Sequence, residues 1–230
     1  MLRQDAYLLS AAISFPLTDS IEVLGKVFTQ DGRSISHILE RISKCRQALF
    51  GIGFNNEELC PLVKSHIWKS IGVSSLLYSV CTGPLTLGEL KMLESFQGQM
   101  VKSSVYLGKF SRHSTLLDVL GIDSISDTIN TQRLNLLRRI FSAPQSSYSF
   151  LCSELISKFC LDGVIPRGTL VGDIMELGYS PVKVAFSDYK IKLDRHREAD
   201  GLHDSIKYLL TQHIRPNDEN CLLLRELTKY

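Results

Sequence analysis

Residues 21–50 constrain the fold most strongly, because they combine strand, turn and helix signals in one short stretch: IEVLGKVFTQDGRSISHILERISKCRQALF. Its first part favours a strand with Leu24-Gly25 at the centre, and Asp31-Gly32 within residues 30–33 is a strong turn signal. Ser34 and Ser36 are suitable N-caps for a following helix. An apolar stripe at helical spacing runs through residues 35–50, formed by Ile35, Ile38, Leu39, Ile42 and Leu49. We therefore expect the strand to pack on this helix, with Ile38 and Ile42 buried.

The remaining pattern is strand-like at the N-terminus and helical afterwards. Residues 6–15 and 21–28 predict two strands joined at 16–19 into a hairpin. The clearest helix start is at Thr86, because Thr86 and Glu89 have capping-box spacing and Leu85 and Leu90 are placed for a hydrophobic staple. Helices are predicted over residues 61–80, 86–105, 124–141, 148–160, 169–177, 181–187, 202–212 and 218–228, and a charged loop over 187–201.

These elements predict a mainly α protein, a helical bundle with a short N-terminal β-hairpin and a small C-terminal helical subdomain. The polar segment 144–147 follows a predicted helix and is the best boundary in the chain. The predicted units are therefore residues 1–33, 34–145 and 146–230. No fixed-period repeat and no low-complexity tract interrupts them.

Charge is nearly balanced overall but unevenly distributed. The chain has 26 Lys+Arg against 24 Asp+Glu, and its 44% hydrophobic and 22% charged content is typical of soluble globular proteins. Residues 21–145 carry fourteen basic and ten acidic side chains, whereas residues 146–230 carry eleven and twelve. An anionic partner is therefore expected on the middle part of the chain.

The cysteines and the hydropathy predict an intracellular protein, nuclear or cytoplasmic, that is not secreted. None of the six cysteines (45, 60, 81, 152, 160 and 221) forms a Cys-x-x-Cys pair, as expected for reduced, buried thiols. A zinc site from Cys60 and His66 needs unusual ligand spacing, so neither a metal nor a cofactor is predicted. No apolar run reaches the length of about 18 residues that a spanning helix needs. Residues 7–17 favour a strand over a signal peptide, because Ser10, Ser14 and Pro16 interrupt them.

Basic residues supply the candidate binding groups. His37, Arg41 and Lys44 stand at i, i+4 and i+7, and so are predicted to share a helix face opposite the apolar stripe. Such a face can follow a phosphate backbone without reading the bases. The alternative is an ordinary solvated face, since Glu40 lies nearby.

Other basic residues can likewise be interpreted either as nucleic-acid contacts or as ordinary structural or surface groups. Lys64 and Lys69 flank Trp68, an arrangement that can bind single strands by stacking, although a half-buried anchor is the commoner role of a lone tryptophan. Lys109, Arg112 and His113 follow a predicted helix end at Gly108, and Arg138-Arg139 is a further basic pair. These groups are suited to phosphate contact. The alternative, for those beside the helix end, is attraction of their positive charge to the negative end of the helix dipole. No nucleophile elbow or glycine-rich phosphate loop occurs, so no catalytic residue is predicted.

The order of these motifs resembles the palm-to-thumb junction of reverse transcriptases from non-LTR (LINE-type) retrotransposons. Val23-Leu24-Gly25 matches that family's aromatic-Leu-Gly primer grip, with Val23 in place of the aromatic residue, and His37-Ile38 matches the start of its thumb. Leu76-Leu77-Tyr78-Ser79 matches a Leu-Leu-Tyr-Gly helix end, with Ser79 replacing glycine. Residues 90–97, Lys102, Leu107-Gly108, 112–114, 116–122 and Arg133-Leu134 follow in the family's order, so the similarity covers residues 15–141.

The resemblance implies a thumb-like bundle from an RNA-directed DNA polymerase. It implies that Val23, Leu24 and Gly25 shape a primer grip and that duplex phosphates meet basic groups of the thumb, here His37, Arg41, Lys44, Lys64, Lys69 and Arg112. The family's palm holds catalytic metal ions with an aromatic-Ala-Asp-Asp turn, whereas this sequence contains no Asp-Asp pair.

We therefore expect a fragment of a retrotransposon reverse transcriptase that lacks the catalytic palm and is inactive alone. Its expected partners are an RNA–DNA or DNA duplex, held weakly and without sequence preference, and the missing palm and fingers. The alternative is a helical protein-interaction module with no role in nucleic-acid binding.

Overall fold

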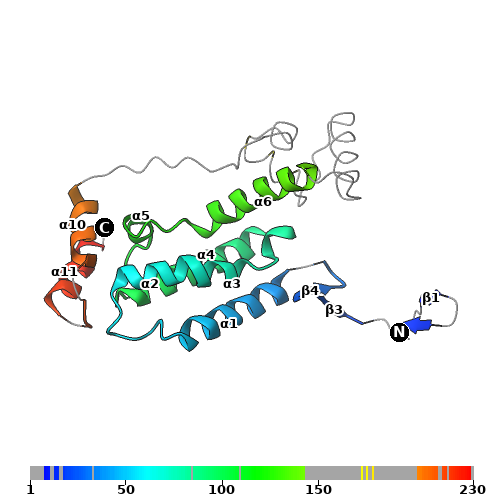
Figure 1. Ribbon diagram of the computed structural model, residues 1–230, viewed down its shortest axis with the longest axis horizontal. Helices are drawn as coiled ribbons and strands as arrows, with labels where there is room; N and C mark the ends of the chain where they lie inside the picture. Colours follow the sequence, from blue (N-terminus) through cyan, green and yellow to red (C-terminus); the bar gives the residue numbers. More distant parts are fainter. Residues whose placement is uncertain are drawn as a thin grey trace.

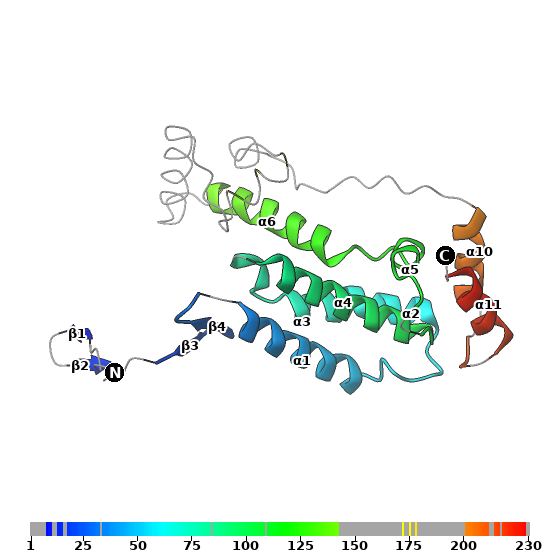
Figure 2. The ribbon, with the colours of Figure 1, turned by 180° about the vertical axis from the view of Figure 1, so that it is seen from behind.

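The computed structural model describes residues 8–10, 13–15, 18–32, 34–83, 85–108, 110–142, 201–211, 214–216 and 218–228, and the single positions 172, 175 and 178. Four short strands precede a series of helices (Figures 1 and 2). The strands are β1 (Leu8–Ser10), β2 (Ile13–Phe15), β3 (Ser20–Val23) and β4 (Lys26–Thr29). The α-helices are α1 (Ile35–Gly51), α2 (Pro61–Ile67), α3 (Val73–Leu77), α4 (Leu87–Ser104), α5 (Ser114–Val119), α6 (Ile125–Ser142), α10 (Gly201–Thr211) and α11 (Glu219–Leu227). The predicted mainly α fold is confirmed.

The strands form two local hairpins instead of the one hairpin predicted. β1 pairs with β2 and β3 pairs with β4, both antiparallel. Leu24 and Gly25 are not the centre of a strand but the turn between β3 and β4, with φ of 50° and 77°. Positive φ at both central residues gives the turn a twist that matches paired strands. The turn predicted after β4 is confirmed, because the Gly32 N–H donates to the Thr29 carbonyl at 3.0 Å.

Helix α1 begins after Ser34, whose carbonyl accepts the Ile38 N–H at 2.9 Å. Ile38 is fully buried and Ile42 is partly buried against the core, as predicted. Ile35 and Leu39 were also placed in the apolar stripe but are exposed. The buried face instead follows residues 37, 38, 41, 45 and 49, because two polar side chains, His37 and Arg41, turn inward.

The helix predicted over 61–80 is divided by a π-helical turn, η1 (Trp68–Gly72), and followed by a 3₁₀ turn, η2 (Val80–Thr82). Pro61 opens α2 as expected for the first turn. Val63 of α2 and Ile71 of η1 are exposed. The bulky Trp68 ring accounts for the glycine in this turn, since a Cβ at Gly72 would lie 2.6 Å from Trp68 Cε3.

Helices α4, α6 and α11 start with side-chain caps, and in α11 the cap is Asp218, which accepts the Cys221 N–H at 2.6 Å. The predicted capping box of α4 is present: Thr86 Oγ1 accepts the Glu89 N–H at 3.3 Å, and Glu89 Oε2 accepts the Thr86 N–H at 2.7 Å. Leu85 and Leu90 are both partly buried against the core. Helix α6 starts in the same way, because Ser124 Oγ accepts the Asp127 N–H at 3.1 Å.

The helices pack into one apolar core. Helix α1 lies along α3 and α4, and α6 covers α4 on the opposite side (Figure 1). Helices α10 and α11, where sequence predicted residues 202–212 and 218–228, lie at the end of the bundle away from β3 and β4. They join the same core through Ile206, Leu210, Cys221 and Leu224. The predicted boundary at 144–147 and the helices predicted over 148–160 and 181–187 lie outside the described residues. Within the helix predicted over 169–177, the structure describes positions 172 and 175, both helical.

The described cysteines are free. Cys45, Cys81 and Cys221 are buried, in agreement with the expected reduced thiols. Burial raises the pKa of the Cys45 thiol to about 12 and that of Cys81 to about 11, so both stay protonated at neutral pH. Of the helices that the structure describes, none has the length and apolarity to cross a membrane.

Replacing Ile38 with alanine should lower the free energy of unfolding by about 2–5 kcal/mol, because the lost side chain leaves a cavity in the core. Leu39→Ala, one residue along the same helix but exposed, should change stability by no more than about 0.5 kcal/mol. Urea unfolding of both variants compares the two sides of α1. Equal losses would mean that the helix is turned differently.

Candidate nucleic-acid interface

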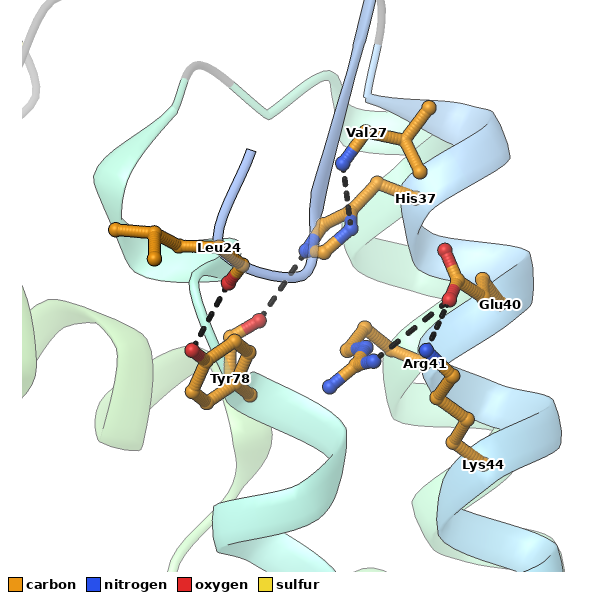
Figure 3. Close-up of polar contacts among 7 residues, drawn as sticks. All are labelled: Leu24, Val27, His37, Glu40, Arg41, Lys44 and Tyr78. Carbon is orange, nitrogen blue, oxygen red and sulfur yellow. Dashed lines mark hydrogen bonds and ion pairs between the residues drawn. The ribbon is translucent and has the colours of Figure 1, made fainter. Parts of the chain in front are cut away.

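Tyr78, at the end of α3, connects three segments that are distant in sequence (Figure 3). Its hydroxyl donates to the Leu24 carbonyl in the β3–β4 turn at 3.0 Å. Its own carbonyl lies 3.2 Å from Nε2 of His37 in α1. Its ring leaves little room for a side chain at Gly25, where a Cβ would lie 3.3 Å from Tyr78 Cε1. Gly25 is therefore favoured both by its positive φ and by this contact.

His37 uses both ring nitrogens on backbone groups. Nδ1 accepts the Val27 N–H of β4 at 3.4 Å, while Nε2 faces the Tyr78 carbonyl. An amide N–H can only donate and a carbonyl can only accept, so the ring is the neutral tautomer that carries its proton on Nε2. Burial lowers the pKa of His37, and the charges of Arg41 and Lys26 lower it further, against the opposing effects of the Tyr78 carbonyl and Glu40. His37 therefore joins the hairpin to α3 as an uncharged group.

Arg41 and Lys44 are paired within the protein. The Arg41 guanidinium lies over the Tyr78 ring, 5.1 Å from its centroid, and its Nη2 is 3.8 Å from Glu40 Oε1. Lys44 forms an ion pair with the same carboxylate. The hydrogen bond from Lys44 and the two positive charges lower the pKa of Glu40. Cation–π stacking holds the Arg41 charge against the ring instead of in solvent.

The exposed basic face predicted for α1 was therefore wrong for two of its three residues. His37 is 2% exposed and Arg41 is 8% exposed, and only Lys44 lies at the surface. His37 and Arg41 do share one face of α1, as their spacing predicted. That face, however, is turned toward the core and not toward the solvent. His37 faces inward, where its ring supplies hydrogen-bond partners to the Val27 N–H and the Tyr78 C=O.

Lys64 and Trp68 are also buried, so neither can meet a nucleic acid as predicted. Lys64 is 1% exposed; its Nζ lies 3.1 Å from the Tyr106 hydroxyl and 4.7 Å from that ring's centroid. Burial lowers the pKa of Lys64. Trp68 is 1% exposed and packs on Phe96 with ring centroids 6.1 Å apart. The predicted stacking platform is instead part of the core.

The remaining predicted cations lie at the surface. Lys69 is exposed on η1, and Arg112 is exposed on the loop between α4 and α5. The Arg112 N–H donates to the Thr228 carbonyl at 3.0 Å, which fixes this loop to the end of α11. Arg139 is exposed and Arg138 half-buried on α6, and Lys109 lies outside the described residues.

Val23, Leu24 and Gly25, which were predicted to form a primer grip, lie at the tip of the β3–β4 hairpin. Leu24 is 88% exposed, and Val23 is exposed beside it on β3. Ile21 and Phe28 oppose each other across the two strands and are exposed as well. Exposed apolar side chains therefore gather at this hairpin.

Sequence reasoning missed the residues that fix this hairpin and its neighbours. Lys26 Nζ donates to Thr82 Oγ1 at 2.7 Å. Arg133 of α6 donates through Nη2 to the Gly83 carbonyl at 2.6 Å and through Nε to the Cys81 carbonyl at 3.4 Å. These bonds join the segment after Tyr78 to other elements. Their signal in the sequence is weak, because a lysine or arginine bound to a distant hydroxyl or carbonyl has no characteristic spacing.

Metal chemistry has no support among the described residues, where no three His, Cys, Asp or Glu side chains are grouped to hold an ion. Comparisons with known protein families, curated proteins and solved structures each gave no match to this chain.

The protein should lose stability as pH falls below about 6.5. An unfolded histidine binds a proton near that pH, whereas folded His37 has a lowered pKa and stays neutral. The unfolded state then binds more protons, so the free energy of unfolding decreases as pH drops toward the folded pKa. His113, whose pKa is also lowered by burial, adds to the decrease.

Urea unfolding of the parent and of His37→Gln between about pH 7.5 and 5 measures this dependence. The variant should be less stable at the upper pH and should decline less steeply. His66→Gln, at an exposed position of α2, is the matched control. If the parent and His37→Gln lose stability equally, His37 is not buried as a neutral group.

Proposed function

We propose that this chain is the primer-grip and thumb region of a LINE-type reverse transcriptase, which grips a primer–template duplex and lacks the catalytic palm. The observation that supports the proposal is the contact around Tyr78. Leu24-Gly25, His37-Ile38 and Tyr78-Ser79 are separate motifs of the resemblance, and their residues form one hydrogen-bonded unit. Motifs that arose by chance in sequence have no reason to meet in space.

The backbone at Ser79 is compatible with the glycine that the resembling family has at this position. It has φ of 60°, in the left-handed region that glycine adopts without strain. A glycine, which the resembling family has at this position, suits the same backbone. Serine keeps the geometry at some cost in stability, so the substitution is compatible with the proposal.

Duplex contact would use the exposed cations Lys44, Lys69 and Arg112 in place of the buried His37, Arg41 and Lys64. Three phosphate contacts neutralise few charges, so the expected affinity lies in the non-specific range, on the order of 10⁻⁴–10⁻⁶ M. The described elements offer no groove-sized helix lined with Asn, Gln and Arg, so discrimination between sequences is not expected. We also propose an intracellular setting, which the buried free thiols Cys45, Cys81 and Cys221 support.

A second function is favoured by the apolar hairpin tip. Ile21, Val23, Leu24 and Phe28 are exposed together on β3, β4 and their turn. In the leading proposal this tip meets the missing palm and fingers, whereas in a protein-interaction module it meets an unrelated partner. Nucleic-acid binding distinguishes the two functions, because the second predicts none.

The isolated chain should not extend a primer. Polymerisation needs carboxylates that hold two metal ions, and the sequence contains no Asp-Asp pair. Incubation with template–primer, labelled nucleotide and magnesium or manganese should give no product above background. Clear extension would contradict the assignment of the chain to the part that lacks the palm.

The chain should bind RNA–DNA and DNA duplexes weakly, with affinity that falls steeply as salt rises. In the triple variant Lys44→Gln, Lys69→Gln and Arg112→Gln, binding should weaken equally for all sequences, and the salt slope should decrease by about one for each lost phosphate contact. Fluorescence anisotropy at several salt concentrations measures both quantities.

Lys207→Gln is the control, since it removes one charge from the exposed surface of α10. It should leave the duplex affinity unchanged. If the triple variant binds as well as the parent at every salt concentration, Lys44, Lys69 and Arg112 do not contact the duplex. A parent that does not bind at all would favour the protein-interaction module.

A further inference from the structure

A cleft of about 530 Å³ lies along one side of α4 and is bordered by the loop that leads to α5. Lys91, Ser95 and Lys102 line it from α4, at positions i, i+4 and i+11, which share one face of a helix. His113 lines it from the loop, and Leu107 adds an aliphatic side chain. None of the cations proposed for duplex contact lines this cleft.

Gly98 allows His113 to form a wall of the cleft. A Cβ at position 98 would lie 3.3 Å from Cγ and 3.4 Å from Cδ2 of the imidazole ring, so the ring rests directly on the helix backbone. Glycine in the interior of a helix as long as α4 lowers its stability relative to alanine. The close approach of His113 is the physical account of this glycine.

The charges in the cleft favour an anion. The pKa of His113 is lowered by burial and by the positive charge of Lys102, and is raised by Glu94. Glu94, the acidic group in the cleft, is hydrogen-bonded by the Ser126 hydroxyl of α6. Lys91 and Lys102 bring two positive charges to this cleft against the one carboxylate of Glu94, so a bound anion is attracted to it.

The lining also indicates the class of anion. Ser95, Gln99 and Ser103 supply hydroxyl and amide groups that can form hydrogen bonds with a ligand. The volume falls within the range of small-molecule sites. A phosphate monoester carries up to two negative charges and three acceptor oxygens, which match a lysine, an imidazole and neighbouring hydroxyls.

We propose that the α4 cleft binds a phosphate monoester of nucleotide size, with the phosphate between Lys102 and His113 and the polar remainder extending toward Ser95 and Lys91. This site is separate from the duplex surface and goes beyond the proposed function. A monoester of this kind occurs on a free nucleotide and at the 5′ end of a nucleic-acid strand. The two sources share the phosphate and differ in the length of the chain attached to it.

Isothermal titration of the full chain tests the site with adenosine 5′-monophosphate, adenosine, and a short single strand with and without a 5′-phosphate. At least one phosphate-bearing probe should bind, and its counterpart without the phosphate should not. Binding of the mononucleotide alone indicates a free nucleotide, whereas binding of the phosphorylated strand indicates a strand end. Equal binding of phosphorylated and unphosphorylated probes, or no binding at millimolar concentration, would overturn the proposal.

Lys102→Gln should weaken binding of the phosphate-bearing probe by roughly 10-fold, because it removes a charge-assisted hydrogen bond. Lys207→Gln, on exposed α10, should leave it unchanged; equal effects of the two variants would contradict the site. Amide chemical shifts of the parent provide a second measurement that needs no variant. Titration should move the signals of Gly98 and His113, and shifts confined to other helices would also overturn the proposal.

The outcome is independent of duplex binding. Blunt duplexes without terminal phosphates report on Lys44, Lys69 and Arg112 alone, so loss of one activity with retention of the other identifies which proposal has failed.

Discussion

The packing of the hairpin on the helices depends on one uncharged histidine. His37 accepts from the Val27 N–H and donates to the Tyr78 carbonyl, so a single ring satisfies a donor and an acceptor on two different elements. A leucine in its place would remove both hydrogen bonds, each of which contributes about 0.5–1.5 kcal/mol. This requirement sets the rotation of α1 and, with it, which of the helix's other residues face the core.

Helix starts could be predicted from the sequence because their determinants are local. Thr86 and Glu89 lie within one turn of α4 and satisfy each other's backbone groups, so no knowledge of the rest of the chain is needed. Ile38 was also placed correctly in the core, whereas Ile35 and Leu39 of the same stripe are exposed. The α2 proline and the Asp31-Gly32 turn follow equally local rules.

The candidate site could not be predicted, because its polar residues are buried by partners distant in sequence. Arg41 is stacked on Tyr78, and Lys64 is held by Tyr106, each partner about forty residues downstream. From sequence alone, a lysine or arginine is expected at the surface. Spacing therefore identified a basic face on α1 that the structure divides between the core and the solvent.

The contacts that hold the β3–β4 hairpin are made largely to main-chain atoms. His37 binds the amide of Val27, and Tyr78 binds the carbonyl of Leu24. A main-chain amide or carbonyl is present whatever side chain its residue carries. The side chains at positions 24 and 27 can therefore be substituted during evolution while these hydrogen bonds keep the hairpin in place. In this part of the molecule, the backbone structure should be conserved more strongly than the sequence.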